Sequence, residues 1–428
     1  MPRYVSCLLT CFVAFGVTAS AADSAADLEW PTFRGPQRSG VSDDTGLLDR
    51  WPEGGPTLLW EADGMGRGYA SPAIADGKIY ILGDGLSTAE DRDEYLICLN
   101  QSDGSLVWQF KTGKPWNSGP ESWQSSRSTA TVDDDRVYTL TAFGQLYCVD
   151  TESGKEVWKV HLENDLGGKK ADSWGYSESV TIDGNLLICT PGGGKNTMVA
   201  LNKMTGETVW SCSSPEDRGA GHASVVISEV FGKKVYVQIT GSSLMGVLAS
   251  DGTLLWTYDI PRTTAVIPTP IVKDDLVFIS VGYNTGGALI RQVATASGGV
   301  DVEEVYGLKP ALNNKHGGVV LVGDYVFGDS GDRGKPFCAE LGTGEIVWSE
   351  RGSGKKSASV TAADGKVFFR YSNGVMTMVP ASPDQFKETG SFKVPGSGSR
   401  PSWAHPVILG GKLYLREGDK LLCYDLKN

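Results

Sequence analysis

A short phrase ending in Trp recurs along this chain of 428 residues. In most copies a small residue is followed two places later by an acidic or amide residue, then by a Gly. The Trp comes ten positions after the small residue, and the copies with this spacing end at Trp108, Trp158, Trp210, Trp256 and Trp348. The first four Trp residues are about fifty positions apart, a period typical of four-stranded propeller blades. The repeat therefore constrains the fold more than any other feature of the sequence.

An alternating hairpin precedes each copy of the phrase. Residues 73–80 and 180–186 are examples, with Asp-Gly at the turn between two apolar stretches. Such a turn is the strongest short-range signal for a β-hairpin. Eight hairpins are expected to open near Pro72, Ala130, Val180, Ser224, Pro270, Val319, Val360 and Pro406. A third strand with the small residue and a fourth strand with the Trp complete each blade.

Two of the eight units depart from the phrase. In the fifth, residues 297–299 stand for the Gly turn and Tyr306 for the Trp. In the seventh, residues 375–379 form the third strand and Phe392 replaces the Trp, without a Gly turn. Their hairpins still alternate, so both are counted as blades.

The two ends of the repeat region complement one another. Residues 421–425 match the third strand of a blade that lacks a fourth, and residues 56–60 match a fourth strand that ends at Trp60. Pairing them leaves no sheet edge open. We therefore predict an all-β, eight-bladed β-propeller of four-stranded antiparallel blades over residues 57–428, in which the N-terminal strand around Trp60 completes the C-terminal blade.

The segment before the repeats divides into two parts. Residues 1–22 contain Arg3, an apolar run and small residues near Ala21, which together are typical of a secretory signal peptide. Residues 23–56 are aromatic and rich in Pro but not periodic, and we expect an ordered arm packed on the propeller. No later stretch is long and apolar enough to span a membrane. These features predict an exported protein, periplasmic or extracellular, that is soluble after signal cleavage.

The net charge bears on the kind of partner, and the cysteine positions bear on disulfide formation. The formal net charge is −12, which argues against nucleic acid as a partner. Four cysteines occupy the small position of the phrase in different blades and are expected to be buried free thiols: Cys98, Cys148, Cys338 and Cys423. Cys189 and Cys212 are the one plausible disulfide pair.

The recurring Trp residues have a structural explanation. A small residue on the third strand leaves room for a flat indole from a neighbouring blade. Burial of that indole stabilises the packing between blades. We therefore interpret six Trp residues as docking residues: Trp60, Trp108, Trp158, Trp210, Trp256 and Trp348.

Polar and aromatic residues gather where the innermost strands begin. Inner strands line the channel of a propeller, so these side chains are expected to surround one mouth of it. The candidate ligand-binding residues are Tyr69, Arg127, Trp174, Tyr176, His222, Lys315, His316, Trp403 and His405. The alternative is that the His and Arg side chains satisfy backbone carbonyl groups. A zinc site built from the three histidines is disfavoured because blades four and eight lie on opposite sides of the ring.

Other motifs for catalysis are missing or incomplete. Residues 191–196 resemble a phosphate-binding loop but lack Ser or Thr after Lys195, and they lie where a hairpin turn is expected. The sequence has no Gly-x-Ser-x-Gly elbow and no His-Glu-x-x-His zinc motif. No catalytic residue and no metal ligand can be assigned.

The phrase resembles that of the pyrroloquinoline-quinone (PQQ) repeat family, the quinoprotein alcohol dehydrogenase-like propellers. Residues 200–210 match the family pattern of small, Asp/Asn, Thr-Gly and Trp throughout. Some members of that family oxidise alcohols or sugars with PQQ and calcium, and others, such as the outer-membrane assembly propeller, are scaffolds. The dehydrogenases carry a disulfide between adjacent cysteines and long insertions, neither of which is present here.

The resemblance therefore implies an exported, non-catalytic binding or scaffold module, monomeric and without a cofactor. A protein partner or a small polar ligand would bind on one propeller face. The alternative is a PQQ-dependent dehydrogenase with calcium, and a third possibility is a glycan-binding module that uses the loop Trp residues.

Overall fold

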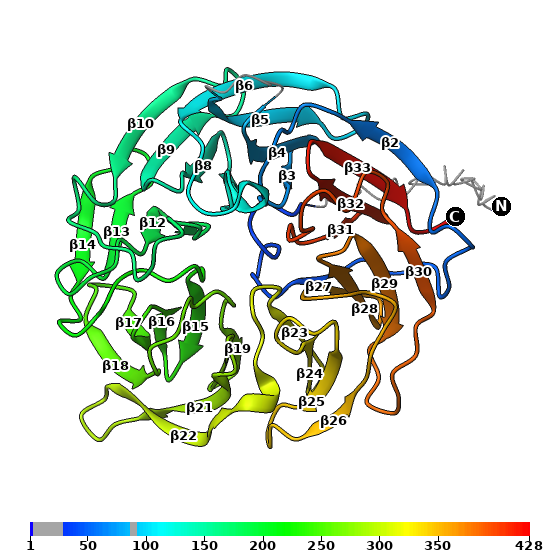
Figure 1. Ribbon diagram of the computed structural model, residues 1–428. Helices are drawn as coiled ribbons and strands as arrows, with labels where there is room; N and C mark the ends of the chain where they lie inside the picture. Colours follow the sequence, from blue (N-terminus) through cyan, green and yellow to red (C-terminus); the bar gives the residue numbers. More distant parts are fainter. Residues whose placement is uncertain (3–28, 86–91) are drawn as a thin grey trace.

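The computed structural model describes residues 1–2, 29–85 and 92–428. Eight sheets stand side by side around a central channel (Figure 1). The predicted all-β propeller of eight blades is therefore confirmed. The expected signal peptide, residues 1–22, lies outside the described residues apart from Met1 and Pro2.

Each blade is ordered from its inner strand outward. The first four blades comprise β3 (Ala73–Ala75), β4 (Lys78–Gly83), β5 (Glu94–Asn100) and β6 (Leu106–Gly113); β7 (Thr131–Asp133), β8 (Arg136–Leu140), β9 (Gln145–Asp150) and β10 (Glu156–His161); β11 (Thr181–Asp183), β12 (Leu186–Cys189), β13 (Met198–Asn202) and β14 (Thr208–Cys212); and β15 (Val226–Val230), β16 (Lys233–Ile239), β17 (Ser243–Leu248) and β18 (Leu254–Asp259). The next three comprise β19 (Ile271–Lys273), β20 (Leu276–Val281), β21 (Gly286–Ala294) and β22 (Val300–Lys309); β23 (Val319–Val322), β24 (Tyr325–Asp329), β25 (Pro336–Glu340) and β26 (Ile346–Ser349); and β27 (Ala358–Ala363), β28 (Lys366–Tyr371), β29 (Val375–Pro380) and β30 (Gly390–Lys393). The eighth comprises β31 (Val407–Leu409), β32 (Lys412–Glu417), β33 (Lys420–Asp425) and β2 (Leu58–Ala62). Two short 3₁₀ helices, η1 (Glu121–Trp123) and η2 (Pro310–Leu312), lie in connections between blades.

The hairpins begin where the sequence predicts them. The eight inner strands start within two residues of the expected positions. Asp76 and Gly77, with φ values of 49° and 68°, form the left-handed turn between β3 and β4. The two irregular blades are also present, with Tyr306 on β22 and Phe392 on β30. Apolar cores fill the space between neighbouring blades, and one such cluster includes Val237 of the fourth blade and Ile290 of the fifth.

The ring closes through a strand from the beginning of the repeat region. Strand β2 pairs antiparallel with β33, and Trp60 lies opposite Cys423 in the register. The predicted closure is therefore confirmed. The structure adds a pairing that the sequence did not predict: β1 (Val41–Ser42) pairs in parallel with the inner strand β27 and makes that sheet five-stranded.

The docking Trp residues contact their neighbours differently from the prediction. The small residue lies beside the Trp of its own blade, since Cys98 is paired with Trp108. A Cβ atom on Gly246 would lie 2.1 Å from the ring of Trp256 in the same blade. The Gly of the following blade receives the outer face of the indole, as Gly206 does for Trp158. The expectation that the small residue receives a neighbouring blade's indole is therefore wrong, because the turn Gly takes that role.

Residues of the expected N-terminal arm cross the channel. The backbone of Trp30 exchanges two hydrogen bonds of 2.8 Å with Ile74 on β3. Farther along, the Arg38 guanidinium donates to the Ser179 carbonyl at 2.8 Å and to the Thr32 hydroxyl at 2.9 Å. Figure 1 shows this blue segment passing through the middle of the ring. The arm thus joins blades on several sides of the channel.

The cysteines and the loop of residues 191–196 can be compared with the predictions. All six cysteines in the described part of the chain are free and buried, so the suggested Cys189–Cys212 disulfide is not formed. Residues 191–196 connect β12 to β13 as expected, and the Gly193 N–H donates to Asp217 at 2.7 Å. The Asp217 carboxylate thus occupies a backbone N–H that a phosphate-binding loop would offer to its ligand. Within the described residues, no helix is long and apolar enough to cross a membrane.

Candidate functional site

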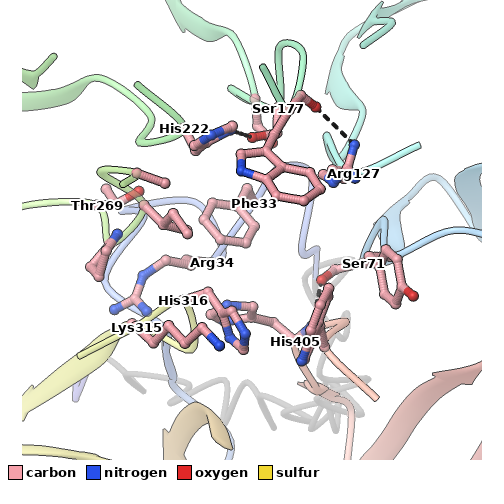
Figure 2. Close-up of a pocket in the computed structure, with 18 of the residues that line it drawn as sticks. Phe33, Arg34, Ser71, Arg127, Ser177, His222, Thr269, Lys315, His316 and His405 are labelled. Carbon is pink, nitrogen blue, oxygen red and sulfur yellow. Dashed lines mark hydrogen bonds between the residues drawn. The ribbon is translucent and has the colours of Figure 1, made fainter. Parts of the chain in front are cut away.

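A cavity of about 340 Å³ lies in the mouth of the channel. Phe33 and Arg34 of the N-terminal arm form part of its wall, together with residues that precede the inner strands (Figure 2). The lining residues are Phe33, Arg34, Tyr69, Ser71, Trp123, Arg127, Trp174, Ser177, Ser179, His222, Thr264, Ala265, Ile267, Pro268, Thr269, Tyr283, Lys315, His316, Gly318, Trp403 and His405. Because they come from most blades and the arm, only the closed ring assembles this cavity.

The structure brings together eight of the nine residues that the sequence suggested for ligand binding. They are Tyr69, Arg127, Trp174, His222, Lys315, His316, Trp403 and His405. Tyr176 lies elsewhere: its ring is buried, and its hydroxyl donates to the Pro191 carbonyl at 2.9 Å. The sequence did not point to Phe33 and Arg34, because they lie more than thirty residues before the first blade's hairpin.

Three cationic side chains face this cavity. Arg34 is 4% exposed and donates to the carbonyl groups of Ser39 and Val319 at 2.6 and 2.5 Å. Burial lowers its pKa to about 10, so it keeps its charge at neutral pH. Arg127 donates to the Trp174 carbonyl at 3.0 Å, and burial lowers its pKa as well. Lys315 forms an ion pair with Asp332 at 3.1 Å.

Aromatic rings cover much of the remaining wall. The Trp403 ring lies 4.8 Å from that of Tyr69 and 4.6 Å from that of His316, measured between centroids. Phe33 meets His405 edge-on at 4.9 Å. Such flat, rigid surfaces bind apolar or aromatic groups with little loss of side-chain entropy.

The three histidines at the mouth are not equivalent. Burial lowers the pKa of His316 and His405 to about 3, so both are neutral at physiological pH. His222 instead lies between two polar partners. Its Nδ1 is 2.6 Å from the Ser177 hydroxyl, and its Nε2 is 2.8 Å from the Asp172 carboxylate. No group of metal-ligating side chains occurs in the described part of the chain, and the histidines do not form one.

Ser177 and Asp172 were not identified from the sequence. They are separated from His222 by 45 and 50 residues, and no local motif surrounds them. In the segment 174–179, only Trp174 and Tyr176 were predicted to bind a ligand. The fold brings Ser177 and Asp172 to His222 because the connection before β11 and the connection before β15 meet at the same mouth.

The residues present do not fit PQQ with calcium. Calcium takes six to eight oxygen ligands, mostly from carboxylate and carbonyl groups. Within residues 29–85 and 92–428, no Asp or Glu lines the cavity, and the nearby carboxylate of Asp172 is bonded to His222. The cations could receive the carboxylates of a quinone, but the donor set for its calcium is missing. These residues therefore do not support an oxidation through that cofactor.

Comparisons with known proteins agree with this architecture. A family model described as "Outer membrane protein assembly factor BamB" (PQQ_2) matches residues 92–350, more than half of the chain. BamB from Moraxella catarrhalis has 17% identity and a TM-score of 0.54, with 89% of this chain and 96% of that chain covered. The quinohemoprotein alcohol dehydrogenase from Comamonas testosteroni has 11% identity and a TM-score of 0.61, with 94% and 81% covered.

A designed protein also has this fold. The computationally designed Ika8 protein has 10% identity and a TM-score of 0.55, with 86% of this chain and 99% of that chain covered. A comparison with curated proteins finds no match. At such low identities the structural likeness shows the fold alone.

Proposed function

We propose, since this chain belongs to the PQQ-repeat family whose model is described as outer membrane protein assembly factor BamB, that it is an exported binding module. Its ligand is held in the mouth of the channel, at the cavity described above. The observation that carries the proposal is the lining itself, in which aromatic walls and three cations converge without a carboxylate among the described lining residues.

Charge indicates the kind of group that binds there. The chain as a whole has a formal net charge of −12, so a cluster of cations at one mouth is a local exception. Positive groups in an apolar pocket favour a carboxylate, because its charge is compensated there after it leaves water. Aromatic walls favour a ring or an aliphatic chain next to that carboxylate.

A protein segment supplies both groups. The family description concerns outer membrane protein assembly, and an exported polypeptide with an aromatic residue beside Asp, Glu or its C-terminal carboxylate fits this pocket. The arm between residues 23 and 56 belongs to the same module in this proposal, because Phe33 and Arg34 line the cavity. The propeller acts as a monomer, since strands of one chain close the ring.

Titration with short peptides tests the proposal. The probes are peptides with Trp or Phe next to a free C-terminal carboxylate, and their C-terminally amidated forms are the comparison. Fluorescence of the cavity Trp residues reports binding. We expect the free carboxylate forms to bind at least about tenfold more tightly, a difference of about 1.4 kcal/mol.

Two Lys variants test whether the peptide carboxylate binds in this cavity. Lys315 lines the cavity, whereas Lys273 forms an ion pair with Asp324 at 2.5 Å on the outside of the cavity. Lys315→Ala is expected to reduce the advantage of the carboxylate peptides, and Lys273→Ala is expected to leave it unchanged. Equal binding of carboxylate and amide peptides would contradict the proposed recognition.

A further inference from the structure

We propose that Ser177 and His222, which line the cavity, form a hydrolytic triad with the neighbouring Asp172 and that the triad cleaves an ester bound there. The established family membership assigns no such reaction, and the inference goes beyond the proposed binding function. It rests on the geometry of these three side chains and stands whether or not peptides bind in the cavity.

The three groups have the mutual contacts that nucleophilic catalysis requires. The Ser177 hydroxyl is 2.6 Å from His222 Nδ1, within reach for proton transfer. The other ring nitrogen, Nε2, is 2.8 Å from an Asp172 carboxylate oxygen. This arrangement makes His222 Nε2 the protonated nitrogen and leaves Nδ1 free to accept the proton of Ser177. Compared with the usual Ser-His-Asp triad, the two ring nitrogens have exchanged partners, while each of the three groups keeps its role.

Backbone contacts hold His222 and Asp172 in place. The second oxygen of Asp172 accepts the Trp174 N–H at 2.9 Å, and the Trp174 carbonyl accepts from Arg127. The His222 N–H donates to the Val266 carbonyl at 2.7 Å. The side chains of His222 and Asp172 are only 6% and 12% exposed, so their hydrogen bond is shielded from water. Although burial opposes its ionised form, Asp172 has a lowered pKa because His222, the Trp174 N–H and Arg127 favour the carboxylate.

The other histidines of the mouth serve as an internal comparison. His316 also approaches a serine, Ser357, but at 3.3 Å, and that hydroxyl lies 2.9 Å from Ser372 as well. No carboxylate contacts the ring of His316 or His405 among the interactions of the described residues. Only His222 has both a hydroxyl and an acid as partners, which distinguishes it from a histidine that merely fills the channel.

Access from the cavity completes the site. Ser177 and His222 both line the cavity, and Figure 2 shows them on its wall. Arg127 reaches the same wall, and its bonds to the carbonyls of Trp174 and Trp123 use two of its five N–H donors. The other three N–H donors and the positive charge of Arg127 can stabilise the carbonyl oxygen of the ester as it becomes negative during the attack by Ser177. A volume of about 340 Å³ and the aromatic walls suit an ester with a small acyl group and a ring.

The reaction has two halves, acylation of Ser177 and hydrolysis of the acyl-serine. In the first, Ser177 Oγ forms a bond to the carbonyl carbon while His222 Nδ1 takes the hydroxyl proton. The bond from that carbon to the alcohol oxygen then breaks, and the alcohol leaves with the proton from His222. In the second, water attacks the acyl-serine, its proton passes to His222, and the acid departs as the proton returns to Ser177 Oγ. The substrates are an ester and water, and the products are an acid and an alcohol.

A fluorophosphonate probe tests the nucleophile in the whole protein. Attack by Ser177 Oγ on phosphorus expels fluoride and leaves a stable adduct, which peptide mass spectrometry locates. We expect a single adduct at Ser177, and hydrolysis of 4-nitrophenyl acetate that falls by at least about 1,000-fold in Ser177→Ala. Ser357→Ala, which removes the looser serine–histidine contact, is the matched control and keeps the wild-type rate. No adduct at Ser177 in the wild type, or a wild-type rate in Ser177→Ala, overturns the proposal.

A second measurement does not depend on finding a good ester. In Ser177→Cys, alkylation of the introduced thiol by iodoacetamide is followed against pH. A base at hydrogen-bond distance lowers the half-maximal pH below about 8.5, the value of an ordinary thiol. Asp172→Asn in the same background is expected to raise it again, since the imidazolium loses its partner. A thiol that titrates at about 8.5 or above in the first variant excludes His222 as the base. Near-UV circular dichroism confirms that each variant remains folded.

Discussion

The indole nitrogen of Trp158 donates a hydrogen bond to the main-chain carbonyl of Lys203 at 3.0 Å, across the boundary between the second and third blades. Trp108 and Trp348 make the same kind of bond with the carbonyls of Thr151 and Ser382. In the fifth blade, the Tyr306 hydroxyl donates to the Leu341 carbonyl at 3.0 Å and so takes the place of the indole N–H. In these four blades the last residue of the repeated phrase therefore links one blade to the next by a hydrogen bond.

A substitution of the turn Gly that packs against the indole provides a first test of this link between blades. A Cβ atom at Gly206 would lie 2.8 Å from the Trp158 ring, and its φ of 75° is already unfavourable for other residues. We expect Gly206→Ala to lower the free energy of unfolding by about 1–3 kcal/mol more than Gly184→Ala. Gly184 has a φ of 57° but no atom within 4 Å of such a Cβ. Urea unfolding of the two variants measures the difference, and equal losses would contradict the contact.

The indole hydrogen bond can be separated from burial of the ring. Trp158 and Trp210 are both 9% exposed, but among the described residues the Trp210 nitrogen has no acceptor. Phe at either position removes a similar apolar area, whereas only Trp158→Phe removes a hydrogen bond. We expect Trp158→Phe to destabilise the protein by about 1 kcal/mol more than Trp210→Phe, measured by chemical denaturation. The opposite order would show that the bond contributes little.

Closure of the ring predicts a sharp difference between two truncations. A chain that begins at Thr57 keeps β2, whereas a chain that begins at Asp63 loses it and exposes the edge of β33. Both lack the N-terminal arm, so the comparison isolates the closing strand. We expect the shorter chain to aggregate or to unfold without a cooperative transition, because an open edge is free to pair with other chains. Size-exclusion chromatography and thermal unfolding provide the readout.

A buried carboxyl group predicts the pH dependence of stability. Burial raises the pKa of Asp329, on β24, to about 8. The native state therefore keeps a proton that the unfolded chain releases near pH 3.9, so this group makes stability fall as pH rises from about 4 to about 8. The slope from one such group is at most about 1.4 kcal/mol per pH unit.

Asp329→Asn removes this titration. We expect its free energy of unfolding to fall less than that of the wild type between pH 5 and pH 8. Glu178, whose pKa burial raises to about 7, is unchanged in both proteins and cancels in the comparison. Parallel pH profiles for the wild type and the variant would show that Asp329 is ionised in the folded protein.

Much of the fold follows from local pattern. The Asp-Gly turns, the alternating strands and the spacing from Cys98 to Trp108 depend on residues close together in the chain, so eight blades could be counted from the sequence. The role of the small residue was misassigned, because the pattern does not show which of two neighbouring indoles it receives. The parallel pairing of Val41 and Ser42 with β27 was also missed, since two residues carry no periodic signal.

For the candidate site, the sequence predicted which residues gather but not which of them bond to one another. That His222, His316 and His405 begin inner strands could be read from the repeat, and their gathering at one mouth followed from propeller geometry. The partners of each histidine could not be predicted, because side chains 45 and 50 residues away reach His222 through connections without periodicity. The sequence alone determined how many blades form and how the ring closes, since the repeated short-range spacing reveals both the complete blades and the two incomplete repeats at the ends of the repeat region. Only the tertiary structure decided which polar groups meet in the channel, because loop paths and side-chain packing bring them together.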